Sequence, residues 1–160
     1  LIIDDTYNSS PFACESALKT LGEIKCGGLP ALPSGREQAG RKIAILGDML
    51  ELGRHTQEAH RNIGKIAKEN ADILVTVGHR AEAIKEGAME AGFKKKNIYE
   101  FLDSSGAKEF IKTFVKKGDL VLVKGSQGMR MERVVEAILL DQENKNKFFV
   151  RQEKEWLEKE

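Results

Sequence analysis

Short apolar segments recur along the chain, and each is followed by a stretch in which apolar residues return every three or four positions. Apolar segments of four to six residues that are rich in Val and Ile are typical of strands buried on both faces of a sheet. The segment at 98–102 carries Glu100 between apolar residues, so we expect it at an edge of the sheet. The predicted strands are Leu1–Asp4, Lys42–Leu46, Ile73–Val77, Ile98–Leu102 and Leu120–Val123.

The stretches between these strands have the spacing of amphipathic helices. Pro11 suits a first helical turn with Ser9 or Ser10 as the N-cap, and Ser104 or Ser105 is expected to cap a later helix. The predicted helices are Pro11–Ile24, Thr56–Asn70, Ala81–Ala91, Ser104–Lys116 and Met129–Leu140. Strands that alternate with helices predict an α/β domain. We expect a three-layer αβα, Rossmann-like domain with a mostly parallel sheet of five to six strands.

Three further parts of the chain complete the expected organisation: its start, a loop at residues 26–41 and the last 20 residues. Cys26–Arg41 is rich in Gly and Pro and is predicted to be a surface loop. Residues 1–140 are expected to form the α/β domain, and residues 141–160 to extend it with an edge strand at Phe148–Val150 and a helix at Gln152–Glu160. The chain opens on Leu1 within an apolar run, which predicts that it is a piece of a longer protein.

The amino-acid composition argues against several functional classes of protein. The 160 residues include 26 Lys and Arg against 25 Asp and Glu, and this balance argues against a nucleic-acid binder. No apolar run approaches the roughly 20 residues of a membrane span. Cys14 and Cys26 lack metal-binding or disulfide-framework spacing, so we expect free thiols and a cytoplasmic location.

The first strand ends in Asp4-Asp5-Thr6-Tyr7-Asn8-Ser9-Ser10-Pro11, and ligands of open α/β sheets bind beyond such ends. Asp5 could accept hydrogen bonds from ribose hydroxyls or support a cation, and the helix start offers N–H groups to an anion. A strand end followed by a capped, Pro-initiated helix explains one Ser and Pro11 without any ligand. That alternative leaves the paired carboxylates and Tyr7-Asn8 unexplained, so both interpretations stay open.

The second strand is followed by Gly47-Asp48-Met49-Leu50-Glu51-Leu52-Gly53. Gly47 permits close backbone approach, and Asp48 can cap a helix or bind a ligand. From the residues alone, we favour a turn with its own apolar plug formed by Met49, Leu50 and Leu52.

The fifth strand is followed by Lys124-Gly125-Ser126-Gln127-Gly128-Met129-Arg130. This turn combines a cation, bare backbone and a hydroxyl, which suits a carboxylate or phosphate. Arg130 is expected in the first turn of the next helix, where the helix dipole disfavours a cation and a ligand would explain it. The chain contains neither a Walker A loop nor a GxGxxG fingerprint.

The histidines do not predict a metal site. His55, His60 and His79 form no HExxH motif and no close set with cysteine, and His55 and His60 would point to different helix faces.

Three of these segments, DDTYNSSP, LGDMLELG and VKGSQGMRME, together resemble the C-terminal domain of the Mur ligases. Within that family they resemble the branch that adds D-alanyl-D-alanine to UDP-N-acetylmuramoyl tripeptide, which usually has D-D-[TS]-Y-N-[AS]-N-P, L-G-D-M-x-E-L-G and V-L-V-K-G-S. Sister ligases typically carry D-Y-A-H-x-P at the first motif, and that motif is absent here. The resemblance spans roughly Ile2–Leu140, with Ser10 where the branch usually has Asn.

The resemblance implies roles for the first motif. Asp5 would contact the ribose of ATP, and Tyr7 and Asn8 would lie on the ATP side of the site. Ser9 would contact substrate where ATP and peptide meet.

The other two motifs receive roles in the same way. Lys124, Gly125 and Ser126 would hold the incoming D-Ala-D-Ala at its carboxylate. Asp48 and His60 match motif positions to which the resemblance gives no role.

The resemblance also implies a three-domain enzyme that forms an acyl phosphate from ATP and then an amide bond. Its N-terminal domain holds the UDP sugar, and its central domain holds the phosphate loop and magnesium. We therefore expect ATP, magnesium, UDP-N-acetylmuramoyl tripeptide and D-Ala-D-Ala as cofactors and partners, and no ligase activity from this chain alone. A stand-alone small-ligand module and a sister ligase that adds another amino acid remain alternatives, which a phosphate-loop domain encoded upstream would help to separate.

Overall fold

The computed structural model describes residues 1–25 and 40–139. Residues 26–39 of the predicted surface loop, including Cys26, lie outside these ranges, as do the segments predicted at 148–150 and 152–160.

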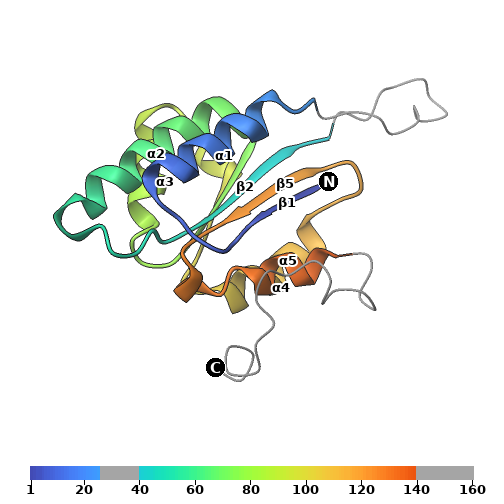
Figure 1. Ribbon diagram of the computed structural model, residues 1–160. Helices are drawn as coiled ribbons and strands as arrows, with labels where there is room; N and C mark the ends of the chain where they lie inside the picture. Colours follow the sequence, from blue (N-terminus) through green and yellow to red (C-terminus); the bar gives the residue numbers. More distant parts are fainter. Residues whose placement is uncertain (26–39, 140–160) are drawn as a thin grey trace.

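A parallel sheet forms the centre of the domain (Figure 1). Its five strands lie in the order β1-β5-β2-β3-β4, and every neighbouring pair is parallel. Strands β2, β3 and β5 are almost wholly buried, which agrees with their continuous apolar sequences. The strands are β1 Ile2–Asp5, β2 Lys42–Gly47, β3 Ile73–Val77, β4 Ile98–Phe101 and β5 Leu120–Lys124. The segment with Glu100 is at one edge, as predicted, and β1 is at the other.

Helices cover both faces of the sheet, so the three-layer prediction is confirmed (Figure 1). On one face lie α1 (Pro11–Glu23), α2 (Thr56–Asn70) and α3 (Glu82–Glu90); on the other lie α4 (Ser104–Phe114) and α5 (Glu132–Ile138). In residues 1–25 and 40–139, three 3-10 helices occur in the connections: η1 Gly53–His55, η2 Lys95–Asn97 and η3 Gln127–Met129. Within the described part of the chain, no helix has the length and apolar character needed to cross a bilayer.

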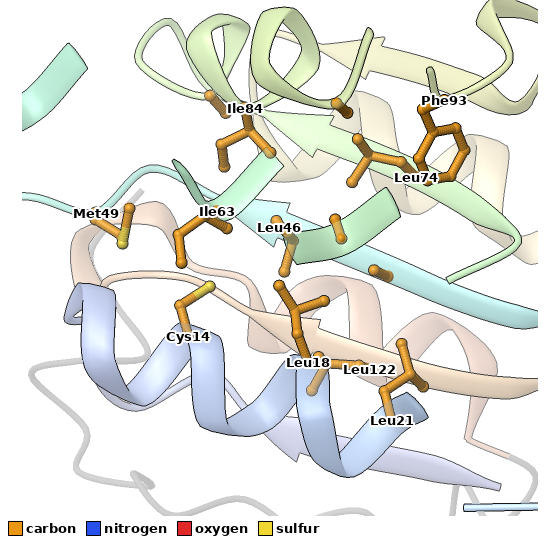
Figure 2. Packing of buried hydrophobic residues seen from close by; sticks show 14 of the residues in the cluster. Cys14, Leu18, Leu21, Leu46, Met49, Ile63, Leu74, Ile84, Phe93 and Leu122 are labelled. Carbon is orange, nitrogen blue, oxygen red and sulfur yellow. The ribbon is translucent and has the colours of Figure 1, made fainter. Parts of the chain in front are cut away.

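Successive side chains of a strand point to opposite faces of the sheet, so the hydrophobic core consists of two layers, one on each face. Leu46 and Leu122 point toward α1 and α2, where Leu18 and Ile63 are fully buried (Figure 2). Ile45 points instead to the face covered by α4 and α5. Each fully buried Leu or Ile side chain contributes about 2 kcal/mol to folding, so both layers are held mainly by apolar contacts.

The start of α5 differs from the sequence prediction. The helix begins at Glu132 and not at Met129, because η3 comes first and Arg130 takes a left-handed conformation with φ 53°. The Arg130 side chain pairs with Glu132 at 2.6 Å (Nε to Oε1). The prediction of a cation in the first helical turn was therefore wrong, and the hint of a ligand drawn from it loses its basis.

Helix caps were predicted with mixed success. Ser10 is the N-cap of α1, since its hydroxyl accepts a hydrogen bond from the Ala13 N–H at 3.2 Å. Helix α4 is capped by Asp103, whose carboxylate accepts from the Gly106 N–H at 2.8 Å. The serine cap expected there was wrong, because Ser104 is buried as the first residue of the helix.

The chain directions make the end of β5 the point at which the sheet connections change face. Helices α1 and α2, which follow β1 and β2, lie on one face, whereas α5, which follows β5 between them, lies on the other (Figure 1). Loops that leave neighbouring strands for opposite faces separate, and ligands of open α/β sheets bind at such points.

Candidate functional site

The three motif-bearing strand ends meet at one edge of the sheet. Strand β5 lies between β1 and β2, and its Lys124 is in register with Asp5 on one side and Leu46 on the other. The predicted residues after β1, β2 and β5 are therefore neighbours in space, although they are far apart in the sequence.

Lys124 ties the first motif to β5. Its side chain is only 1% exposed, and its ammonium lies 2.8 Å from the Asp5 carboxylate and donates to the Asn8 carbonyl oxygen at 2.6 Å. A buried ammonium requires such partners because removing a charge from water is costly. Lys124 thus holds the loop between β1 and α1, and its direct contact with a dipeptide carboxylate stays a prediction.

The loop of residues 6–10 between β1 and α1, called here the open loop, carries polar groups that protein atoms satisfy only in part. The Asn8 side-chain oxygen accepts from the Ser9 N–H at 2.7 Å. The Ser9 hydroxyl is buried, and among the described residues it has no hydrogen-bond partner. Tyr7 is 51% exposed. A buried hydroxyl left without a partner beside the start of a helix is a feature that a bound polar ligand would explain.

Cys14 lies on α1 behind this loop. Burial raises the pKa of its thiol to about 12, against the opposing effect of the Lys124 charge. At neutral pH the sulfur is therefore a protonated thiol inside the core, unsuited to act as a nucleophile.

The loop of residues 48–52 after β2, called here the closed loop, is bound from several sides. The Met49 N–H donates to His60 Nε2 at 2.9 Å, and His60 Nδ1 lies 2.7 Å from the Thr56 carbonyl oxygen. These contacts require a neutral ring with its hydrogen on Nδ1. Burial lowers the pKa of His60, which favours the same neutral form. Met49 is fully buried and Leu52 packs against the core, so the predicted apolar plug is confirmed for these two residues, whereas Leu50 is only half-buried.

Asp48 anchors the start of the closed loop. Its carboxylate accepts from the Ala81 N–H at 2.8 Å and lies 3.5 Å from the Arg80 guanidinium, while its own N–H donates to the Val77 carbonyl oxygen at 3.1 Å. Gly78 makes this approach possible, because it has φ 108° and a Cβ there would lie 2.4 Å from the Asp48 carboxylate.

Ser126 joins the closed loop to the turn after β5. Its N–H donates to the Asp48 carbonyl oxygen at 3.0 Å, and its hydroxyl accepts from the Leu50 N–H at 2.8 Å. Beneath these bonds the backbones of Gly47 and Gly125 lie close together, since a Cβ on Gly125 would be 3.2 Å from the Gly47 Cα. Any larger residue at Gly125 would also press into Met131.

The predicted site residues therefore form two groups at one edge. The first joins Asp5, Asn8 and Lys124 by direct contact, with Ser9 and Tyr7 beside them. The second group is Asp48, His60, Gly125 and Ser126.

Sequence reasoning missed the partners that hold the closed loop. Val77 is the last residue of β3, and Arg80 and Ala81 follow it. Nothing in these residue types predicts a contact with Asp48. Gly78 after a buried strand was the one available signal, because a glycine there allows close approach of another chain segment.

One hollow lies away from this edge, among charged side chains of α2, α3 and β4. There Arg61 pairs with Glu86 and Glu90, and Lys85 pairs with Glu100. These charges compensate one another, so we regard this hollow as a solvated surface and the edge at β5 as the site. Within the described residues, no three His, Cys, Asp or Glu side chains are grouped to hold a metal ion.

Comparison with known proteins gives consistent results. The sequence profile described as "Mur ligase, glutamate ligase domain" matches residues 1–127. The UDP-N-acetylmuramoyl-tripeptide–D-alanyl-D-alanine ligase of Bacillus subtilis is 32% identical over 139 residues, which are 86% of this chain and 28% of that protein. The Escherichia coli protein of the same name is 28% identical over 142 residues, which are 86% of this chain and 26% of that protein.

Solved structures agree with the sequence comparison. The MurF ligase from Thermotoga maritima in complex with ADP superposes with a TM-score of 0.62 at 30% identity, over 92% of this chain and 29% of that one. A MurF structure from Acinetobacter baumannii has a TM-score of 0.65 at 27% identity, over 84% of this chain and 27% of that one. The chain thus spans less than a third of the length of these relatives. By its sequence and its fold, the chain belongs to the Mur ligase family, whose glutamate ligase domain it carries.

Proposed function

We propose that this chain is the C-terminal domain of a cytoplasmic, three-domain ligase that uses ATP to join D-alanyl-D-alanine to UDP-N-acetylmuramoyl tripeptide. One observation carries the proposal: the three motifs shared with that branch of the family converge at the end of β5. The names of the relatives from Bacillus subtilis and Escherichia coli support the same reaction. The ADP complex of the Thermotoga maritima relative supports the use of ATP.

The open loop would serve the nucleotide side of the reaction. Asp5 is partly exposed beside Lys124, so a carboxylate oxygen can accept from ribose hydroxyls while the ammonium holds the group in place. Tyr7 and Asn8 would flank the nucleotide, and the unsatisfied Ser9 hydroxyl would bond the substrate where nucleotide and peptide meet.

The turn after β5 would serve the dipeptide. Gly125 leaves its backbone uncovered, Ser126 supplies a hydroxyl, and the Lys124 charge favours an anion such as the dipeptide carboxylate nearby. Held there, the dipeptide amine would attack the acyl phosphate formed from ATP and the tripeptide carboxylate, and inorganic phosphate would leave. The domain's contribution is orientation and exclusion of water. Because the described residues offer no cluster of metal ligands, we assign magnesium to the other domains.

The test is phosphate release by the full-length ligase with ATP, UDP-N-acetylmuramoyl tripeptide and D-Ala-D-Ala. We expect release to require all three compounds and kcat/KM to fall at least about tenfold in Asp5→Ala and Ser126→Ala. Lys117→Met, at an exposed position away from the site, is the control. Release that depends on a different amino acid would instead identify a sister ligase, and no release with any amino component would indicate a binding module. The 160-residue chain alone is expected to release no phosphate.

A further inference from the structure

We propose that Asp48 and His60 are positioning residues for the dipeptide site, because they hold the closed loop in the place from which it orients the Ser126 hydroxyl. The inference rests on the proposed function and assigns roles to two motif positions that the reaction alone leaves unexplained.

The closed loop acts on Ser126 through its backbone. The Leu50 N–H donates to the Ser126 hydroxyl oxygen at 2.8 Å, and the Asp48 carbonyl oxygen accepts from the Ser126 N–H at 3.0 Å. The closed loop therefore binds both the main chain and the side chain of Ser126. The position of the serine depends on where residues 48–50 lie.

The Leu50 contact also sets the chemical role of the hydroxyl. A serine hydroxyl has one hydrogen and two lone pairs, and one lone pair is occupied by the Leu50 N–H. The hydrogen must then point away from Leu50, so the group is prepared to donate. A hydroxyl that donates recognises a carboxylate, the group that the proposed dipeptide presents.

His60 holds the middle of the closed loop. Its Nδ1 is bonded to the Thr56 carbonyl oxygen one turn earlier in α2, which orients the ring, and Nε2 accepts from the Met49 N–H at 2.9 Å. Both His60 and Met49 are completely buried, so water cannot replace a lost acceptor. Removing Nε2 would displace Met49, and with it Leu50.

Asp48, the first residue of the closed loop, attaches the loop to the end of β3 and to the residues that follow it. The Ala81 N–H and the Arg80 guanidinium bind its carboxylate, and Val77 receives its N–H. The closed loop is thus attached to two different elements: Asp48 ties it to the end of β3 and the residues that follow, and His60 ties it to α2.

The experiment uses two amide substitutions that each reproduce one ring nitrogen of His60. His60→Gln places an oxygen near Nε2 and can still accept from Met49, whereas His60→Asn can reach only toward Thr56. His55→Asn, on an exposed histidine of the neighbouring η1, is the matched control. His60→Leu serves as a second variant without an acceptor.

The first measurement is amide hydrogen exchange on the full-length ligase. We expect exchange at Met49 and Leu50 to become at least about tenfold faster in His60→Asn and His60→Leu, and to stay within about threefold of the wild type in His60→Gln. Protection of the β3 amides reports whether each variant is folded. Unchanged protection at Met49 and Leu50 in folded Asn and Leu variants would overturn the proposed attachment.

The second measurement is steady-state kinetics of the same proteins. We expect the KM for D-Ala-D-Ala to rise about tenfold in His60→Asn and His60→Leu, with the KM for ATP within about twofold and with recovery in His60→Gln. A merely structural role would lower kcat or change both KM values alike, and that result would overturn the positioning role. If the wild type does not use D-Ala-D-Ala, the proposed function and this role fail together, while the exchange data still decide the attachment.

Discussion

The open loop and the closed loop lie at the same edge of one sheet, yet they treat their polar groups differently. In the closed loop, the Asp48 carboxylate and the Met49 and Leu50 amides all have partners inside the domain. In the open loop, the Ser9 hydroxyl has no partner among the described residues, and Tyr7 is half exposed. The difference indicates where a ligand is expected: polar groups that the protein satisfies build the site, and the unsatisfied Ser9 hydroxyl is the group that a ligand would complete.

The strongest test of the closed loop is Gly78→Ala. The methyl group would meet the Asp48 carboxylate, and φ 108° is strained for any residue with a Cβ. We expect a loss of about 3 kcal/mol in unfolding free energy by urea denaturation. Gly92→Ala shares a positive φ but has nothing within 4 Å, so it should lose about 1 kcal/mol. Equal losses would mean that the contact with Asp48 contributes nothing.

Lys124→Met tests the attachment of the open loop. The thioether fills similar space, but the Asn8 carbonyl oxygen loses its hydrogen-bond donor and Asp5 loses its cation. Because Asp5 remains partly exposed, we expect a loss of about 2 kcal/mol in unfolding free energy, less than a fully buried ion pair would cost. The exposed Lys117→Met should change stability by less than about 0.5 kcal/mol. A loss in Lys124→Met as small as in this control would show that the ammonium does not hold the loop.

Two adjacent serines of the open loop should respond in opposite ways. Ser10→Ala removes the N-cap of α1 and should cost about 1 kcal/mol of unfolding free energy. Ser9→Ala removes a buried hydroxyl without a partner and should be neutral or slightly stabilising in the unliganded protein. Thermal denaturation of both variants gives the comparison. A loss at Ser9 equal to that at Ser10 would mean that its hydroxyl has a structural partner.

The smallest expected effect is the pH dependence contributed by His60. Its pKa is lowered first by burial and further by Arg80, with Thr56 and Asp48 opposing. The unfolded chain therefore binds a proton more readily than the folded one. The contribution to stability is complete above the unfolded pKa of about 6.5 and is lost as the pH falls from there through the lowered folded value. Urea titrations between pH 7.5 and 5 should show a steeper decline for the wild type than for His60→Gln, and parallel curves would refute the assignment.

Much of the fold was accessible from the sequence because its strands are short, apolar and separated by helices of ordinary length. The continuous apolar segments around Ile45, Val75 and Leu122 are typical of strands in a parallel sheet covered on both faces, and these residues are fully buried there. Arg130 was misplaced because residue type does not reveal a left-handed conformation, and here the 3-10 turn before it decides where α5 starts.

The site was accessible only in part. The convergence of Asp5 and Lys124 followed from strand ends meeting at one edge, but their direct pairing depends on the position of β5 between β1 and β2. The strand order could not be obtained from periodicity. The role of His60 was hidden for the same reason, because its partner is a backbone amide, and any residue at position 49 other than proline would supply it.

The placement of β5 has a consequence for how the chain folds. Strand β2 pairs with β3, and β3 with β4, so each of these pairs joins strands that are consecutive along the chain, whereas Lys124 and Asn8 must come together across 116 positions. Closing so long a loop costs entropy that local contacts do not have to overcome. We therefore expect the β2–β3–β4 unit to form early and β1 to dock last, so that the contact of the open loop with Lys124 is completed only in the final step of folding.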